Sequence, residues 1–538
     1  MQIKPYAVSK LPFSDLFKNY CQQQNKILKF FESPPFDDKA LQERANDFQF
    51  LGNREVATEF LTDFNKKFGA SAKSLHNINR LKESNSLVVV TGQQLTLYGG
   101  PLYTIYKTLS AIITAEKYEK LLNRPVIPVF WLADEDHDAE EISEIGLLNQ
   151  DDLSSCKVNF EMSEIRSGEL PLGDVIDSFR QCVNDRLFET DFSDDLWKLL
   201  DECYNSSRTV SESFGMLMMK LFGKHGLVLA GSNSDLVKNQ VADVLVQSVK
   251  NQKEIYQSLS ETTDQLENEG YHGQVHLTES NLFYITDNNH RAKLKVTDGT
   301  WSVEETGEQW TSDELIEKIK SHPNRFSPNV FLRPVLQDRL LPVISYVAGP
   351  GEVAYYAQMK GVYELFKQKM PQILPRFSAT IVESAVDRIF DKLPFTLEEY
   401  HQRIEDLESQ FIEKSDKPDI EAIFGEWKQK VNELTDQKKE VIGEIDPTLK
   451  NSAGKASAIY FTELDKLKGK IYRSLKQQEK TQIDRISKIK SNLYPGGNLQ
   501  EREIAFIYFL NKYGLDLFDK LLNELKNEDS DTHKLIYL

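Results

Sequence analysis

The sequence predicts an α/β protein with a parallel-sheet core, two insertions between the core strands and a helical coiled coil after them. A β-branched run, a helical pattern and a second apolar run follow one another between Leu87 and Leu132. Strand-like and helical patterns alternate again from residue 214 to 377. After about residue 385, glycine and strand formers become rare. Alternating strands and helices indicate a parallel sheet, and the later composition indicates long helices.

The central element is a β-α-β unit between Leu87 and Ile142. Val88–Val90 is a β-branched run, which is typical of a strand buried on both faces. A helical pattern runs from Pro101 to about Leu122, with Pro101 expected in the first turn, and Val126–Leu132 is the second strand. The two strands are expected to be parallel, because a helix joins them. Polar residues after both strands therefore meet at the edge where open α/β sheets bind ligands.

The pattern divides the chain into three parts. Residues 1–384 form the predicted core, whose first helices pack over an edge of the sheet. Insertions are expected at about 150–210 and at 270–328, and the second alternates like a small antiparallel meander. Residues 385–495 keep apolar residues three or four apart and predict an antiparallel coiled-coil arm that needs a partner. Residues 496–538 are expected to return to the core as a helical segment.

Composition excludes several classes of function. A formal net charge of −18 argues against nucleic acid as a partner. No apolar run is long enough for a membrane span, and the first residues lack a secretory signal. Four cysteines, far apart and without a CxxC pair, argue against a zinc site and a disulfide framework: Cys21, Cys156, Cys182 and Cys203. A cytoplasmic protein is expected.

The turn after the first strand is a candidate binding element. Thr91, Gln93 and Gln94 supply a hydroxyl and two amides, which can hold a carboxylate, ribose or phosphate oxygen. The alternative is a polar turn that bonds only to itself.

The start of the following helix is a second candidate. Gly99 and Gly100 precede free N–H groups that favour an anion, and Lys107 lies two turns into the helix. An ordinary helix start is the alternative. The P-loop motif is absent from the sequence.

The densest polar cluster is Asp134-Glu135-Asp136-His137-Asp138, directly after the second strand. The carboxylates are expected to raise the pKa of His137 and to disfavour full ionisation of one another. Asp134, Asp136 and His137 are the candidate catalytic residues, suited to an ammonium group, ribose hydroxyls or Mg²⁺. The alternative is a solvated acidic loop.

A glycine turn and two arginines complete the candidate set. Gly349-Pro350-Gly351-x-x-Ala354 partly matches the dinucleotide fingerprint, but the next strand does not end in an acidic residue, so NAD is not expected. Gly349 and Gly351 could still let a ligand approach the backbone. Arg333 and Arg376, expected at or just past strand ends, could bind a carboxylate or phosphate. A salt bridge in the core is the alternative for each.

Long segments of the chain together resemble one family. They are TGQQ at 91–94 with GGPLYTIYKTLSAI at 99–112, PVFWLADEDHDAEEI at 128–142, NVFLRPVLQD at 329–338, ISYVAGPGEVAYYAQ at 344–358, ILPRFSATIVES at 373–384 and NLQEREIAFIYFLNKYG at 498–514. The segments are similar to the BshC family, cysteine ligases of bacillithiol biosynthesis, and the resemblance covers nearly the whole chain.

The resemblance implies a Rossmann-like core similar to class I aminoacyl-tRNA synthetases, and a homodimer formed through the coiled coil. It implies a ligase that adds L-cysteine to glucosaminyl-malate in the last step of bacillithiol biosynthesis. ATP, with Mg²⁺, is the expected co-substrate that activates cysteine as an adenylate. Asp134, Asp136 and His137 would bind the acceptor amine, or a metal, and take up its proton. The nucleotide is expected between the Thr91–Gln94 turn and the Gly349–Gly351 turn.

The sequence departs from class I synthetases at three points. Leu97–Pro101 stands where a His-Ile-Gly-His motif would be, and Pro375–Ser378, with Ser378 a candidate ligand contact, replaces the Lys-Met-Ser-Lys-Ser motif. No set of three cysteines and a histidine is visible, so zinc is not expected. The rival hypothesis is therefore a synthetase-like scaffold that has lost catalysis and acts through its coiled coil.

Overall fold

The computed structural model describes residues 1–149, 152–160, 165–414 and 419–538. They divide into two compact units. Unit 1 comprises residues 1–380 and 500–536, and unit 2 comprises residues 381–499 with the last two residues. No helix in this described part of the chain is long and apolar enough to cross a membrane.

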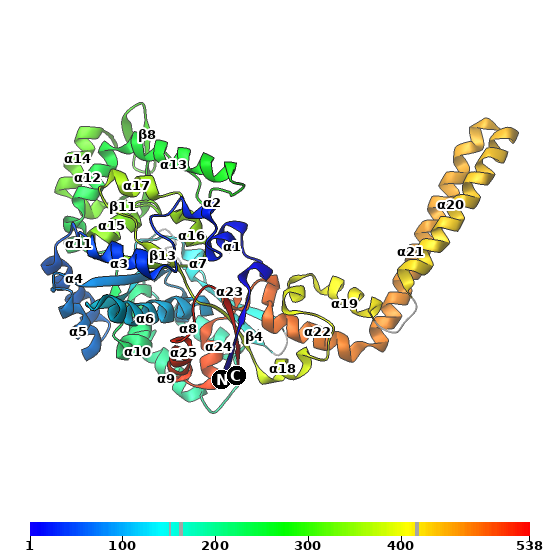
Figure 1. Ribbon diagram of the computed structural model, residues 1–538, viewed down its shortest axis with the longest axis horizontal. Helices are drawn as coiled ribbons and strands as arrows, with labels where there is room; N and C mark the ends of the chain where they lie inside the picture. Colours follow the sequence, from blue (N-terminus) through cyan, green and yellow to red (C-terminus); the bar gives the residue numbers. More distant parts are fainter. Residues whose placement is uncertain (150–151, 161–164, 415–418) are drawn as a thin grey trace. The chain divides into compact units, whose positions relative to one another are not determined.

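Unit 1 is built on a sheet of five parallel strands in the order β13-β12-β2-β3-β6 (Figure 1). The strands are β2 (Leu87–Gln93), β3 (Val126–Leu132), β6 (Val228–Ala230), β12 (Val343–Ala348) and β13 (Gln372–Pro375). From β2 the chain adds β3 and β6 on one side and later adds β12 and β13 on the other. The direction of strand addition therefore reverses between β2 and β12. This confirms the predicted parallel α/β core, and open sheets bind ligands at such a reversal.

Helix α6 (Leu102–Leu122) joins β2 to β3 and is buried along most of its length. Ala111, Ala115 and Tyr118 of this helix pack in one core cluster with residues of β2, β3 and β12. Pro101 caps the helix in an extended conformation, so the expectation that it lies inside the first turn is wrong by one position. The helix ends at Asn123 in the left-handed conformation.

The other helices of unit 1 follow the α/β pattern, and two helical segments are interrupted. The segment from residue 235 to 268 forms three helices, and the segment after β12 forms two. Those bounds are α11 (Asp235–Gln240), α12 (Ala242–Lys250), α13 (Gln252–Asn268), α16 (Pro350–Tyr356) and α17 (Lys360–Leu365). The remaining ones are α1 (Asp15–Cys21), α2 (Asn25–Leu28), α3 (Asp38–Asn46), α4 (Arg54–Lys67), α5 (Ala72–Arg80), α10 (Val210–Phe222) and α15 (Arg333–Leu340).

The N-terminal helices cover one edge of the sheet, as predicted. Asn65 of α4 accepts a hydrogen bond from the Leu229 N–H at 2.8 Å and donates one to the Leu229 carbonyl at 2.7 Å. Leu229 belongs to β6, whose outer side has no neighbouring strand among the described residues. One buried amide thus satisfies backbone groups that an open edge strand would expose.

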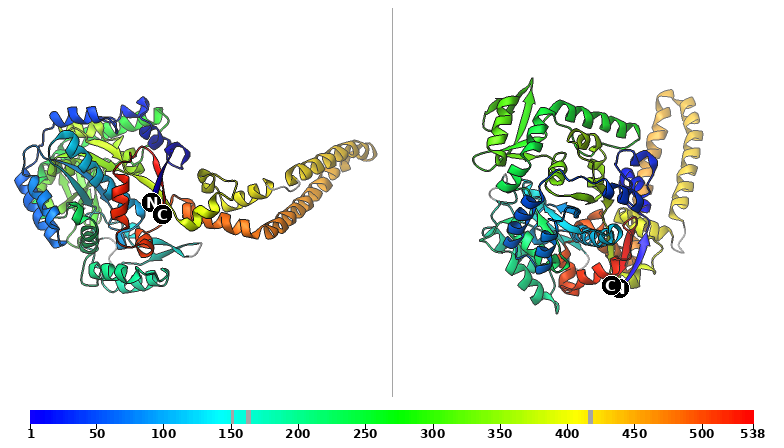
Figure 2. Two further views of the ribbon diagram at one scale, coloured as in Figure 1. Left: turned by 60° about the horizontal axis from the view of Figure 1, so that its bottom comes forward. Right: turned by 60° about the vertical axis from the view of Figure 1, so that its left-hand side comes forward.

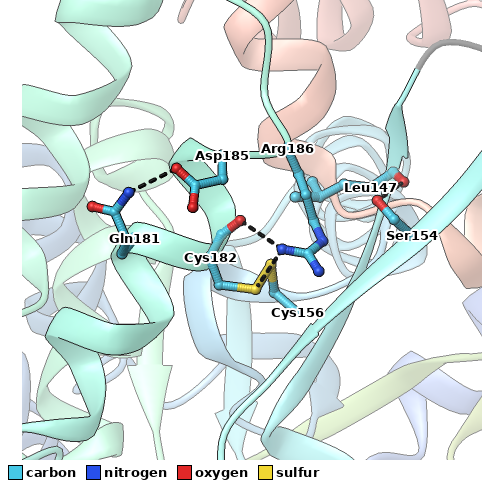
Figure 3. Close-up of a disulfide and its surroundings, with 7 residues drawn as sticks. All are labelled: Leu147, Ser154, Cys156, Gln181, Cys182, Asp185 and Arg186. Carbon is cyan, nitrogen blue, oxygen red and sulfur yellow. Dashed lines mark hydrogen bonds between the residues drawn. A yellow bond between two sulfur atoms is a disulfide. The ribbon is translucent and has the colours of Figure 1, made fainter.

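The first insertion contains a β-hairpin and two helices. The hairpin is β4 (Glu144–Asn149) with β5 (Asp152–Lys157), preceded by α7 (Ala139–Ile142) and followed by α8 (Val175–Asn184) and α9 (Ser193–Cys203). A disulfide joins Cys156 of β5 to Cys182 of α8 (Figure 3). The expectation that the cysteines form no disulfide is therefore wrong. Their separation of 26 residues carries no sequence signal, and only the packing of α8 against the hairpin brings their Cα atoms to 5.8 Å.

The second insertion is the predicted antiparallel meander with one more helix. Its sheet has the order β10-β9-β8-β7-β11. The elements are β7 (Leu282–Ile285), β8 (Arg291–Thr297), β9 (Thr300–Val303), β10 (Gln309–Thr311), α14 (Ser312–Ser321) and β11 (Phe326–Pro328). Every strand pair of this sheet is antiparallel, as the alternating pattern predicts.

Unit 2 is helical. Its members are α18 (Ser384–Phe390), α19 (Ile404–Glu413), α20 (Ile420–Ile445), α21 (Lys450–Gln478) and α22 (Lys480–Leu493). Helices α20 and α21 lie side by side as a hairpin (Figures 1 and 2). Ion pairs between them include Lys428 Nζ to Asp465 Oδ1 at 2.6 Å. A small core around Phe424 and Leu464 joins the two helices at one end.

The C-terminal segment packs in unit 1. It contains α23 (Gln500–Glu503), α24 (Phe506–Tyr513), α25 (Leu517–Leu525) and β15 (His533–Tyr537), and β15 lies between β1 (Gln2–Tyr6) and β14 (Ser378–Val382). Glu501 forms a buried, bidentate ion pair with Arg376, with N–O distances of 2.8 and 3.0 Å. His533 is fully buried and hydrogen-bonds to Ser378 and Thr380 at 2.7 and 2.9 Å.

The burial of His533 predicts a loss of stability in acid. Burial lowers the pKa of His533 from 6.5 to about 4, so the unfolded chain binds a proton more tightly than the folded chain. The contribution of His533 to the free energy of unfolding should be constant above pH 6.5 and fall by about 3 kcal/mol between pH 6.5 and 4. Urea unfolding of unit 1 across this range measures the loss. His533→Gln should remove this part of the slope, and an identical slope in that variant would contradict the assignment.

Candidate functional site

A cavity of about 1030 Å³ lies in unit 1 at the C-terminal ends of β2, β3 and β12. Gly92 and Gln93 of β2, Trp131 of β3 and Tyr346 of β12 line its floor. The second insertion supplies another part of the lining, including Phe283. The cavity therefore occupies the point where strand addition reverses, at the edge where the sequence predicts a ligand.

One wall is fixed by a buried ion pair between Lys107 and Glu352. The Lys107 ammonium lies 2.6 Å from Glu352 Oε2 and donates to the Gly92 carbonyl at 2.7 Å and to Gln93 Oε1 at 2.9 Å. Glu352 also accepts from the Tyr346 hydroxyl at 2.7 Å. Burial lowers the pKa of Lys107, although Glu352 opposes the shift. All three ammonium hydrogens have protein partners. Lys107 therefore orders the site and has no free hydrogen to donate to a ligand.

Arg333 lines the same wall, but it does not follow a strand. It is the first residue of α15, and β11 ends earlier, at Pro328. The prediction placed Arg333 at a strand end and is wrong there, because residues 329–332 form a turn. Its guanidinium donates to Gln337 Oε1 and to the Tyr355 hydroxyl, both at 3.1 Å. The remaining donors can still meet an anion in the cavity.

The first two acidic residues after β3 are buried and differ in charge state. Asp134 accepts from the backbone N–H groups of Ser232 and Asn233 at 3.1 and 3.3 Å. Burial, and then the neighbouring Glu135, raises the pKa of Asp134 to about 7. Glu135 instead pairs with the buried Lys238, which keeps its pKa below the ordinary value despite burial. The sequence predicts that the carboxylates disfavour the ionisation of one another, and Asp134 is the one whose ionisation is disfavoured.

Asp136, His137 and Arg291 form the second wall. Asp136 accepts from Gln94 Nε2 and from the His137 N–H, and it lies 3.6 Å from Arg291 Nη1. Burial opposes its charge, but Arg291 and Gln94 hold the pKa of Asp136 below its usual value. Burial and Arg291 together lower the pKa of His137. The expectation of a raised pKa for His137 is wrong, because burial and the charge of Arg291 outweigh the two carboxylates that raise it.

Arg291 comes from β8 of the second insertion, and the sequence analysis missed it. Its side chain donates to Ser327 Oγ at 3.1 Å and to the Pro328 carbonyl at 2.7 Å, and it lies 3.8 Å from the centre of the Phe283 ring. A possible signal was the spacing of Arg291, Lys293 and Lys295, which puts three cations on one face of a short strand. A charged strand face is usually solvated, so the signal could not identify a site by itself.

The start of α6 is covered by the C-terminal segment. The Leu102 N–H, one of the free donors expected to bind an anion, bonds to the Ile504 carbonyl at 3.0 Å. Gly99 is so close to Phe506 that a Cβ atom there would lie 2.2 Å from the ring. Gly99 and Gly100 do not line the cavity. They permit this close packing with positive φ angles and are not brought to the site.

Three other predicted ligand contacts are used inside the core. Thr91 donates to the Val347 carbonyl at 3.0 Å and thereby ties β2 to β12. Arg376 is committed to Glu501, and Ser378 bonds to the same carboxylate at 3.0 Å. For Arg376 the alternative of a core salt bridge is therefore the observed one.

The second glycine turn lies beside the cavity lining and not in it. Gly349 has φ −79° and caps α16, where its N–H donates to Glu352 Oε2 at 2.7 Å. At Gly351 a Cβ atom would meet only Gln274, at 3.9 Å. Neither position needs glycine, because the backbone is not left-handed there and no neighbouring atom would clash with a Cβ atom. In the described residues no group of three or more His, Cys, Asp or Glu side chains is arranged to hold a metal ion.

The position of Arg291 predicts a measurable shift at His137. Arg291→Gln should raise the pKa of His137, because the variant removes a positive charge and leaves the Asp136 carboxylate unpaired. Histidine NMR titration, assigned with a His137→Gln variant, measures the shift. Arg291→Lys is the matched control, since it keeps the charge and should shift the pKa less. A lowered or unchanged pKa in Arg291→Gln would show that burial alone sets it.

Comparison with known families agrees with this architecture. Residues 1–377 match the family described as bacillithiol biosynthesis BshC, N-terminal Rossmann-like domain, and residues 379–538 match the C-terminal coiled-coil domain of the same family. The "Putative cysteine ligase BshC" of Salinibacter ruber is 31% identical over 530 residues, which cover 97% of this chain and 96% of that protein. The proteins of the same name from Koribacter versatilis and Chlorobaculum tepidum are 32% and 30% identical over 94% and 90% of this chain. The chain belongs to the bacillithiol biosynthesis BshC family.

Proposed function

We propose that this protein is an ATP-dependent ligase that joins L-cysteine to glucosaminyl-malate, the last step of bacillithiol biosynthesis. The names of the relatives support the cysteine ligase activity. The single structural observation that carries the proposal is the cavity at the strand reversal, where the Lys107–Glu352 and Asp136–Arg291 pairs converge. Amide-bond formation from a free carboxylate needs an activated acyl group, and ATP supplies it.

The reaction has two steps in this proposal. The cysteine carboxylate attacks the α-phosphorus of ATP, pyrophosphate leaves, and an acyl adenylate forms. The sugar amine then attacks the acyl carbon, AMP leaves, and one proton departs from the nitrogen. Magnesium would bind together with ATP. In nucleotide sites its ligands are commonly the substrate phosphates, several water molecules and one or two carboxylates. The chain's own task is to place the two substrates and to accept the proton.

Asp134 and Asp136 of the acidic turn after β3 have different roles toward the acceptor in this proposal. Asp136 remains ionised and can hold the amine as an ammonium group. Asp134, with a pKa of about 7, can exchange a proton near neutral pH. Gln93 and Gln94 present amides beside them, and Arg333 supplies donors for phosphate or malate on the opposite wall. The nucleotide is placed along the floor between the ends of β2 and β12.

The proposal predicts that activation and transfer can be separated. Asp136→Asn should lower product formation by about two to four decades, while cysteine-dependent exchange of pyrophosphate into ATP continues. Product formation from glucosaminyl-malate and isotope exchange measure the two steps. Glu140→Gln is the control, because Glu140 is an exposed carboxylate of the same segment. Loss of exchange in Asp136→Asn would place Asp136 in activation instead.

The rival function is a synthetase-like scaffold without catalysis. The absence of both signature motifs favours it, because these segments hold Leu97–Pro101 and Pro375–Ser378 instead, and both are packed in the core. The same assays discriminate the two functions. Wild-type protein that shows neither exchange nor product would support the scaffold.

The exposed apolar residues of unit 2 support a homodimer formed through α20 and α21. Leu434, Val441 and Ile459 are 56%, 51% and 67% exposed on these helices. Large apolar side chains repeated along one helical hairpin indicate a surface that another chain covers. A second copy of the chain is the partner that the family resemblance implies.

Charged substitutions test the dimer without removing any segment of unit 1. The triple variant Leu434→Glu, Val441→Glu and Ile459→Glu should sediment as a monomer, because three carboxylates would have to be buried in the interface. Gln437→Glu adds a charge at an exposed polar position of α20 and should leave the dimer intact. A triple variant that still sediments as a dimer would place the interface elsewhere.

A further inference from the structure

Strand β8 of the second insertion carries three cations at alternate positions: Arg291, Lys293 and Lys295. Alternate side chains of a strand point to the same face. Ala292 and Leu294, on the other face, are buried in the insertion. All three cations line the cavity, so the insertion contributes a positively charged wall to the site.

The three cations differ in what they bind. Arg291 is held by Asp136 and by the β11 backbone. Lys295 forms an ion pair with Glu304 of the same insertion. The side chain of Lys293 makes neither an ion pair nor a hydrogen bond with any residue that the structure describes. Lys293 is thus the uncommitted cation of this wall, whereas Lys107 across the cavity is fully satisfied by protein atoms.

Phe283 neighbours both Lys293 and His137. Lys293 and Phe283 are register partners on β8 and β7, so their side chains share one face. The rings of Phe283 and His137 meet with centroids 6.0 Å apart. Lys293 also acts electrostatically on His137, where it disfavours the protonated ring. The ammonium and the imidazole therefore border the same part of the cavity.

The tautomer of the neutral His137 ring follows from its neighbour Arg291. Arg291 Nη1 lies 3.3 Å from His137 Nδ1. A guanidinium can only donate, so Nδ1 is the acceptor and the neutral ring carries its hydrogen on Nε2. The side chain is 38% exposed. His137 therefore offers the cavity an N–H donor beside the Lys293 ammonium, and a donor beside a free cation fits an oxyanion.

Acidic groups also border the cavity and limit what can bind there. Asp136 is neutralised by Arg291 and bonded to Gln94. Glu141 and Glu279 lie in the lining without a cation paired to them in the described residues. At the insertion wall, a ligand that carries both an amine and a carboxylate matches this alternation better than the triphosphate, for which the proposed function uses the floor of the cavity.

We propose that Lys293 and the Nε2–H group of His137 bind a carboxylate of the malyl group of the acceptor. This assignment rests on the proposed ligase function. Holding the carboxylate on the insertion wall leaves the sugar amine free to reach Asp134 and Asp136 on the core side. The insertion would then select an acceptor by its acidic arm, while the core performs the transfer.

Steady-state kinetics of the full-length protein test the subsite. In Lys293→Gln the KM for glucosaminyl-malate should rise about tenfold, with little change in kcat or in the KM values for ATP and cysteine. Methyl glucosaminide, which lacks both carboxylates, should be a poor acceptor for wild type and variant alike. Lys320→Gln is the control, because Lys320 is an exposed lysine of the same insertion outside the cavity lining, and it should behave like wild type. A rise in the KM for ATP alone, or no change, would overturn the assignment.

Binding of malate separates this inference from the ligase function. Calorimetry should detect malate binding to wild type and to Lys320→Gln, and weaker binding to Lys293→Gln. If the assays show no ligase activity but this difference in malate binding holds, the anion subsite stands and the ligase function falls. If wild type and Lys293→Gln bind malate and glucosaminyl-malate equally, the subsite falls while the ligase function is still judged by its own assays.

Discussion

The buried ion pair between Lys107 and Glu352 is the interaction on which the geometry of the site depends. Lys107 belongs to the helix that follows β2, and Glu352 to the helix that follows β12. The pair therefore joins the two halves of the sheet at the point where strand addition reverses. Removing one partner would leave a buried charge uncompensated, which costs several kcal/mol. The Gly92 carbonyl and the Tyr346 hydroxyl complete the pair, so the floor of the cavity is ordered before any ligand binds.

Elements with a strong local pattern could be predicted from the sequence. Contacts between segments that are far apart in the sequence could not. Val88–Val90 and Val126–Leu132 carry continuous apolar runs, so their strands and the parallel core follow from the pattern. The direction of the pKa shift at His137 could not be predicted, because Arg291 is 154 residues away in the chain. Arg376 and Glu501 are separated by 125 residues, so the sequence could not distinguish a core ion pair from a ligand contact.

The C-terminal segment shows the same limit in a different way. The sequence places a helix start with free N–H groups after Gly99 and Gly100, and such a start favours an anion. The structure instead directs the backbone of Ile504 and the ring of Phe506 onto it. The helix-start pattern thus identified backbone N–H donors that exist, but it could not identify the groups that accept their hydrogen bonds. The same segment supplies Glu501, so it replaces two predicted ligand contacts with packing in the core.

The acidic turn illustrates how one short segment can hold two carboxylates in opposite states. Asp134 and Asp136 are two residues apart, yet the pKa of Asp134 is raised to about 7 while that of Asp136 is lowered. Burial, and then the adjacent Glu135, raises the pKa of Asp134, whereas Arg291 and Gln94 outweigh the burial of Asp136. Environments that push two pKa values apart assign the proton acceptor and the permanent anion of a site. The insertion that supplies Arg291 therefore shapes the chemistry of the core, and not only the outer wall of the cavity.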